Sequence, residues 1–158
     1  LTRKSDAPLD FDFDLVKDKS RDNPVFYVQY AHARIFSVMK NARELGWQVD
    51  DVDLAGASFD ALTHEAELGL IQLLGTYPRM LAAAAQAREP HRVAFFLMDL
   101  AAAFHGLWNL GKEELRLRFV QEDDEAGSMA RLALIRATAL TLRSGFDVIG
   151  VTPQDELR

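Results

Sequence analysis

The chain of 158 residues has a mass of 17.7 kDa, which is the size of a single domain with a substantial core. Hydrophobic residues make up 49% and charged residues 27% of the sequence, which excludes an intrinsically disordered chain. The absence of cysteine excludes disulfides, thiolate nucleophiles and cysteine-ligated metal sites. Because 18 Lys and Arg residues stand against 24 Asp and Glu, the net charge is −6, and a nucleic-acid partner would need a local basic patch.

The first 22 residues lack a helical period. Apolar and acidic residues alternate over residues 9–15, which predicts an extended segment with one buried face. No second strand is evident nearby, so we expect this segment to be loosely ordered or to pack against a neighbouring domain. The chain begins at Leu1 without a basic and apolar leader; we expect no signal peptide, no membrane span and a longer parent protein.

The rest of the chain predicts an all-α fold, a helical bundle of about five helices. Asn23 followed by Pro24 supplies an N-cap and a favourable first helical residue. The spacing of apolar residues then predicts a helix over residues 24–45, ended by Gly46. Residues 47–61 contain four Asp and no sustained period, which predicts a surface loop.

Four further helices are predicted from apolar spacing and from the helix-breaking residues between them. Gly75 should end the second, Pro78 begin the third, Pro90 begin the fourth and Gly145 end the fifth. The fourth has the densest apolar pattern and is predicted to be central. Residues 111–124 are expected to form a connection, and the apolar residues 148–153 a tail that packs against the bundle. These helices are expected over residues 63–74, 78–88, 90–109 and 125–144.

No catalytic or metal site is predicted in this chain. The histidines, at positions 32, 64, 91 and 105, lack the spacing that places two metal ligands on one helix face. Asp50, Asp51 and Asp53 lack the ligand spacing of a calcium loop. Glycine-rich phosphate loops and nucleophile elbows are also absent.

One helix face carries an unusual combination of side chains. Tyr27, Tyr30, Arg34 and Asn41 fall within about 60° of one another on the helix predicted over residues 24–45. Tyrosine stacking with a nearby guanidinium is a common way to bind unpaired RNA bases. The same pattern also fits an ordinary amphipathic border with Arg34 paired to a carboxylate. Spacing alone leaves both interpretations open.

The string DNPVFYVQYAHAR at residues 22–34 closely resembles the start of the C-terminal anticodon-binding domain of bacterial arginyl-tRNA synthetases. Residues 3–6 and 9–12 resemble the segment that precedes it. Residues 100–109 resemble the central helix of that family, and residues 131–153 its closing helix and tail. The resemblance covers essentially the whole chain.

This resemblance implies an all-helical domain that grips the anticodon arm of an arginine tRNA. Tyr30 and Arg34 match the positions expected to face the anticodon bases. Tyr27, Asn23 and His105 are further RNA-binding candidates under the same resemblance.

Other matched residues are expected to support this contact. Gln29 and His32, together with Tyr27, are expected to hold the preceding loop and the helix in place. Trp108 is a possible additional contact, with core packing its stronger interpretation.

The resemblance also implies the organisation of the parent enzyme. Residues 1–22 would be the junction from a catalytic domain that is missing here, and residues 23–158 the anticodon-binding domain. The parent would be an arginine–tRNA ligase of class I that uses ATP with Mg²⁺, a cytoplasmic and monomeric protein. This chain alone would hold no cofactor and would not be catalytic. Its expected partners are arginine tRNA and the upstream catalytic domain.

A second hypothesis is an acidic helical protein-interaction domain, which the net charge allows. The two hypotheses differ in their surfaces. RNA binding predicts a basic face that joins Arg34 with arginines of the last helix, such as Arg131, Arg136 or Arg143.

Overall fold

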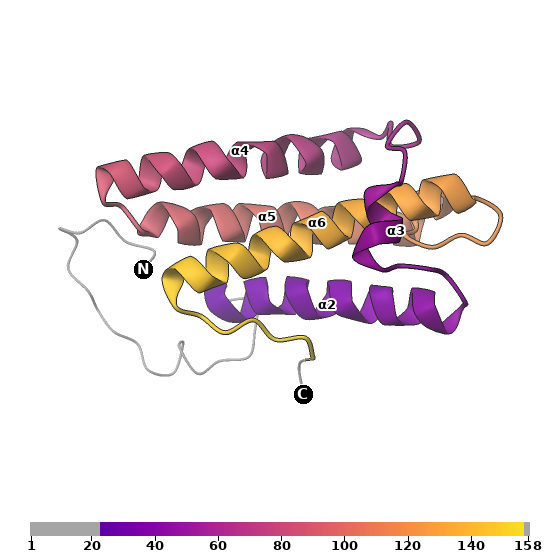
Figure 1. Ribbon diagram of the computed structural model, residues 1–158, viewed down its shortest axis with the longest axis horizontal. Coiled ribbons are helices and arrows are strands. Elements are labelled where there is room, and N and C mark those ends of the chain that lie inside the picture. Colours follow the sequence, from indigo (N-terminus) through magenta and orange to yellow (C-terminus); the bar gives the residue numbers. More distant parts are fainter. Residues whose placement is uncertain (1–22, 157–158) are drawn as a thin grey trace.

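The computed structural model describes residues 23–156. It contains four long helices that lie side by side, with α2 and α4 on opposite sides of α5 and α6 (Figure 1). A short helix, α3, crosses near one end of the bundle, and a 3₁₀ turn, η1, follows α5. Within the described residues there is no strand, which confirms the predicted all-α class. The predicted extended segment, residues 9–15, lies outside the described part of the chain. The elements are α2 (Pro24–Glu44), α3 (Asp51–Ala55), α4 (Glu65–Ala87), α5 (His91–Glu113), η1 (Leu115–Leu117) and α6 (Glu125–Ile149).

Helix α2 begins and ends as the sequence predicts. The side-chain oxygen of Asn23 accepts hydrogen bonds from the backbone N–H groups of Val25 and Phe26, at 3.1 and 3.3 Å. Pro24 occupies the first turn, where its missing N–H removes no helical bond. Beyond the last helical residue, Gly46 has a φ of +89°, a backbone conformation that favours glycine.

The predicted loop over residues 47–61 is partly wrong, because it contains α3. Val49 and Leu54 are buried in the core, and residues 51–55, which include Leu54, form a five-residue helix. A helix of this length is too short to show a 3.6-residue apolar period, so the pattern of the sequence does not reveal it.

The two helices predicted over residues 63–74 and 78–88 are one helix, α4, and Pro78 lies inside it. An interior proline removes one backbone hydrogen bond at a cost of about 3 kcal/mol. Packing on α5 and α6 compensates, since Leu70 and Tyr77 are buried. The Tyr77 hydroxyl also lies 3.0 Å from the Ser144 hydroxyl of α6, within hydrogen-bond distance. Tertiary contacts therefore override the local signal to stop.

Helices α5 and α6 are longer than the sequence predicts. Gly111 lies inside α5, although it is expected in the connection after it, and Gly145 lies inside α6, although it is expected to end it. A Cβ added at Gly145 would lie 2.4 Å from Leu97 Cδ2, so this glycine allows the close approach of α6 and α5. Gly111 likewise lies against the backbone of Leu117. Helix α6 ends at Ile149 and is capped by Gly150, which has a φ of +72°. The predicted apolar tail does pack on the core through Ile149, the last residue of α6, and Val151.

Helix α5 is the centre of the bundle, as predicted. It contacts α2, α4 and α6, and Leu97, Leu100, Phe104 and Leu107 are almost completely buried. By length and composition alone α5 could cross a membrane. Its contacts with three other helices account for the same apolar character.

A buried ion pair joins α4 to α6. Arg131 Nε donates to Glu67 Oε1 at 2.8 Å, and these side chains are only 6% and 1% exposed. The other carboxylate oxygen of Glu67 accepts the backbone N–H of His64, the N-cap of α4, at 3.0 Å. Glu67 therefore caps its own helix while it neutralises Arg131.

Alanine should have opposite effects at Gly69, which has open space around it, and at Gly145, which lies against Leu97. Gly69→Ala should raise the free energy of unfolding by about 0.5–1 kcal/mol, because a Cβ there meets nothing within 4 Å. Gly145→Ala should lower it by about 1–3 kcal/mol, because the new methyl group overlaps buried Leu97. Urea unfolding followed by circular dichroism measures both. Stabilisation by Gly145→Ala would show that α5 and α6 are less closely packed here.

Candidate nucleic-acid interface

The packing of α2 against α5 brings the predicted aromatic face of α2 to two rings of α5. The guanidinium carbon of Arg34 lies 4.3 Å from the centre of the Tyr30 ring and 4.6 Å from that of Trp108. Both distances are typical of cation–π contacts. Arg34 is therefore held by Tyr30 on its own helix and by Trp108 on the neighbouring one.

His105 completes this cluster. Arg34 Nη1 donates to His105 Nδ1 at 3.4 Å, and Arg34 Nη2 donates to the Tyr30 hydroxyl. The His105 ring centre lies 4.8 Å from that of Tyr27 and 5.5 Å from that of Tyr30. We call Tyr27, Tyr30, Arg34, His105 and Trp108 the aromatic–arginine cluster. It contains four of the five residues that the sequence singled out for RNA binding.

Arg34 has no carboxylate partner within residues 23–156, so the amphipathic-border interpretation with an ion-paired Arg34 does not hold there. Its guanidinium lies against two aromatic rings and bonds to the Tyr30 hydroxyl and the His105 ring. A guanidinium held in this way keeps its charge uncompensated and can pair with an anion such as a phosphate.

The fifth candidate, Asn23, has a structural task. Its side-chain oxygen caps α2, and the residue is buried. Its predicted contact with RNA stays a prediction.

Gln29 and His32 hold the C-terminal tail on α2. Gln29 Nε2 donates to the Thr152 carbonyl at 3.0 Å, and buried His32 Nδ1 lies 2.9 Å from the Gln154 carbonyl. Their expected part in holding the loop before α2 concerns residues outside the described range.

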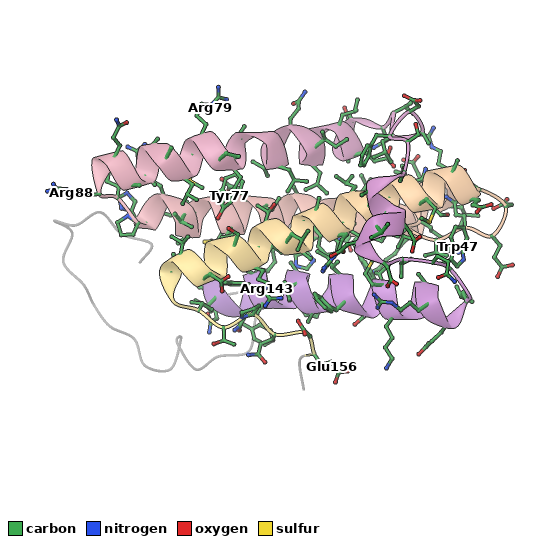
Figure 2. The ribbon with its side chains drawn as sticks, in the orientation of Figure 1. Trp47, Tyr77, Arg79, Arg88, Arg143 and Glu156 are labelled. Carbon is green, nitrogen blue, oxygen red and sulfur yellow. The ribbon has the colours of Figure 1, made fainter. Side chains whose placement is uncertain are left out.

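Two of the α6 arginines that were candidates for a basic face with Arg34 are instead ion-paired within the bundle. Arg131 is buried against Glu67. Arg136 forms a two-pronged ion pair with Asp51 of α3, at 2.7 and 3.0 Å. Arg143 is exposed, and Figure 2 shows it on α6. Two of the three arginines therefore stabilise the fold, because the packing of α6 on α4 and α3 places carboxylates opposite them.

Other cations lie closer to the cluster. A cleft of about 480 Å³ opens beside Trp108, and its lining includes Lys112 and Arg118 together with Ser37 and Asn41 of α2. Helical spacing places Asn41 on the face of Tyr30 and Arg34, but it does not identify Ser37, Lys112 or Arg118 as neighbours of that face. One signal was available for Lys112, which follows Trp108 by four residues and so lies on the same face of α5.

Among the residues described, no group of three or more histidine and acidic side chains is arranged to hold a metal ion.

Comparison with known proteins gives a consistent result. Residues 28–157 match the DALR anticodon binding domain. The arginine–tRNA ligase of Parvibaculum lavamentivorans is 55% identical over 159 aligned residues, and that of Ruegeria pomeroyi is 51% identical over 158. Each alignment covers 100% of this chain and 27% of the ligase, so the chain spans about a quarter of the length of these relatives.

Solved structures show the same relationship. A crystal structure from Campylobacter jejuni, assigned as an arginyl-tRNA synthetase, is similar with a TM-score of 0.81 and 26% identity, over 99% of this chain and 31% of that one. The arginyl-tRNA synthetase of Thermus thermophilus gives a TM-score of 0.61 and 25% identity, over 90% and 22% of the two chains. The fold is therefore that of a helical domain of aminoacyl-tRNA synthetases. The chain belongs to the DALR anticodon-binding domain family.

The ion pair between α3 and α6 predicts a pH-dependent contribution to stability. The hydrogen bond from Arg136 lowers the pKa of Asp51. A carboxyl with a lowered pKa stabilises the fold above its ordinary pKa, near 4, and loses that effect as the pH falls through the lowered value. Asp51→Asn should therefore cost up to about 1 kcal/mol at pH 7, as for other exposed pairs, and progressively less below about pH 4.

Urea unfolding at several pH values measures this difference. Asp53→Asn is the matched control, since Asp53 lies in the same first turn of α3 and forms no ion pair with any residue between 23 and 156. Equal losses in the two variants at pH 7 would contradict a specific role for the pair with Arg136.

Proposed function

We propose that this chain is the anticodon-binding domain of an arginine–tRNA ligase and that its aromatic–arginine cluster binds the anticodon arm of an arginine tRNA. The observation that carries the proposal is Arg34, a charged side chain set between two aromatic rings without a carboxylate partner in the described residues. Membership of the DALR family and the names of the relatives support it.

The cluster suits an unpaired nucleotide. Tyr30 is 38% exposed, so one part of its ring is available to stack on a base. Arg34 lies one helical turn further along α2 and supplies a charge-assisted hydrogen bond to the phosphate or to the base edge. His105 accepts a hydrogen bond from Arg34 and orients it for this contact.

The net charge of −6 means that such binding is local and not driven by the field of the whole chain. Specific contacts at the cluster must then contribute most of the affinity. We expect a shallow dependence on salt compared with a strongly basic RNA-binding protein, because few phosphates are neutralised.

The greater length of the relatives supports a longer parent protein. In this proposal residues 1–22 form the junction to a catalytic domain, residues 23–158 form the anticodon-binding domain, and ATP with Mg²⁺ is used elsewhere in the ligase. The upstream domain and arginine tRNA are the partners, and the parent is a monomeric enzyme of the cytoplasm.

Substitutions in the cluster test the proposal with the 158-residue chain and an RNA hairpin that carries an arginine anticodon loop. Tyr30→Ala removes a stacking surface and Arg34→Ala removes a charge-assisted contact, each worth about 1–3 kcal/mol. Each should weaken binding by about ten- to a hundredfold. Fluorescence anisotropy at fixed salt measures the dissociation constant.

Arg79→Ala is the matched control for the loss of one positive charge. Arg79 is exposed on α4 and points away from the bundle (Figure 2). Circular dichroism and the melting temperature of each variant should equal those of the wild type. If well-folded Tyr30→Ala and Arg34→Ala bind as tightly as Arg79→Ala, the cluster does not bind the anticodon loop. If the wild-type chain binds the arginine anticodon hairpin no more tightly than an unrelated hairpin, the result would favour the protein-interaction alternative.

A further inference from the structure

We propose that buried Arg131 is a positioning residue for RNA binding, because it fixes the part of the chain from which Arg118 reaches the RNA. We call that part, residues 115–124, the η1 segment. The inference rests on the proposed function and deepens it, since it adds a residue that acts on the RNA only through another. Arg131 is 5% exposed, whereas Arg118 is exposed.

The guanidinium of Arg131 joins three parts of the chain. Its Nε donates to Glu67 of α4 at 2.8 Å. Its Nη1 lies 3.4 Å from Asp124 Oδ2, at the N-cap of α6, and 3.5 Å from the carbonyl oxygen of Arg118. Because a guanidinium presents its donors in a fixed planar fork, the position of each acceptor is tied to the positions of the other two. The η1 segment is therefore held at both Arg118 and Asp124.

Two other residues of α6 hold the same segment. The backbone N–H of Gln121 donates to the hydroxyl of Ser128 at 2.8 Å, and that hydroxyl donates to the Gln121 carbonyl at 3.1 Å. Ser128 is completely buried. A Cβ at Gly127 would overlap the carboxylate of Asp124, so this glycine leaves room for the carboxylate opposite Arg131. The first two turns of α6 thus provide a fixed support for the η1 segment.

The support turns Arg118 outward. Leu117 and Phe119, on either side of it, are buried, and the backbone of Arg118 is extended, with a φ of −63° and a ψ of 140°. Successive side chains of an extended backbone point in opposite directions. Arg118 therefore points away from the core, and it lines the cleft beside Trp108, whose ring is covered by Arg34 of the cluster.

The charge of Arg118 is available to a phosphate. Arg118 forms no ion pair with any residue between 23 and 156, and none of the residues that line the cleft is acidic. A guanidinium binds a phosphate through charge-assisted hydrogen bonds. It does so with a smaller loss of conformational entropy when the backbone that carries it is already ordered, so the network around Arg131 should raise the affinity for RNA.

Arg131→Lys and Arg118→Ala test this inference with the 158-residue chain and the arginine anticodon hairpin. The lysine keeps a positive charge opposite Glu67 but replaces the fork by a single nitrogen. Each variant should weaken binding by about three- to tenfold, the loss of one charge-assisted contact. The double variant should bind as Arg118→Ala does, because the two changes remove the same contact.

The dependence on salt separates positioning from a loss of stability. Each phosphate contact that is lost should reduce the slope of log K against log salt by about 0.7–0.9. Arg118→Ala should show this reduction. Arg131→Lys should show it too, although the substituted residue is buried and keeps its charge. Fluorescence anisotropy between about 50 and 200 mM salt measures the slope, and a merely structural role of Arg131 would leave the slope unchanged.

Arg136→Lys is the matched control for Arg131→Lys. Arg136 also lies on α6 and pairs with a carboxylate of another helix, but that carboxylate is Asp51 of α3. The control should have the affinity and the salt slope of the wild type.

Gly127→Ala decides the question if Arg131→Lys does not fold. It displaces the Asp124 carboxylate without a change of charge, and it should weaken binding with the same reduction in slope. Gly69→Ala is its control, because a Cβ at Gly69 meets nothing within 4 Å, and it should bind as the wild type does.

The outcomes separate this inference from the proposed function. If Tyr30→Ala weakens binding but Arg118→Ala, or a well-folded Arg131→Lys, binds as the wild type does, the inference is wrong and the proposed function stands. Additive losses for Arg131→Lys and Arg118→Ala, or an equal loss for Arg136→Lys, would also overturn the inference, because Arg131 would then act on the fold in general. Absence of hairpin binding by the wild type would overturn both.

Discussion

The packing of α2 on α5 is the constraint on which the candidate site depends. Ala31 and Ile35 of α2 are completely buried, so the rotation of this helix is fixed by its apolar face. That rotation leaves Tyr30 and Arg34 at the border of the interface, against rings of α5. The core thus sets the geometry of the proposed RNA-binding face, because the aromatic–arginine cluster lies at the polar edge of the same helix pair.

The acidic character of the chain is compatible with RNA binding because its cations have different tasks. Arg131 and Arg136 of α6 pair with carboxylates of α4 and α3 and so hold the bundle together. Arg34 has no carboxylate partner in the described residues, and Lys112 and Arg118 line a cleft without acidic residues. The charge available to a ligand is therefore decided by pairing in three dimensions and not by the number of basic residues.

Prolines, glycines and capping residues predicted helix ends correctly where they satisfied the hydrogen-bonding groups of the backbone. They were misleading where tertiary packing offset their local cost. Asn23 and Pro24 start α2 because they supply an acceptor and remove an unneeded donor. Pro78 also reads as a helix start, yet it lies inside α4, whose burial on α5 offsets the lost hydrogen bond. Gly145 reads as a stop, yet it serves the contact with Leu97. In both cases the deciding neighbour is distant in sequence.

The sequence by itself determined the all-α class, the central position of α5 and the shared face of Tyr30 and Arg34, because these follow from helical periodicity within single segments. Only the tertiary structure decided that Arg34 rests on Trp108 and that Lys112, Arg118 and Asn41 surround one cleft. It also decided which arginines are neutralised. These outcomes depend on the relative rotation of helices and on partners such as Glu67 and Arg131, 64 positions apart, which no local period specifies.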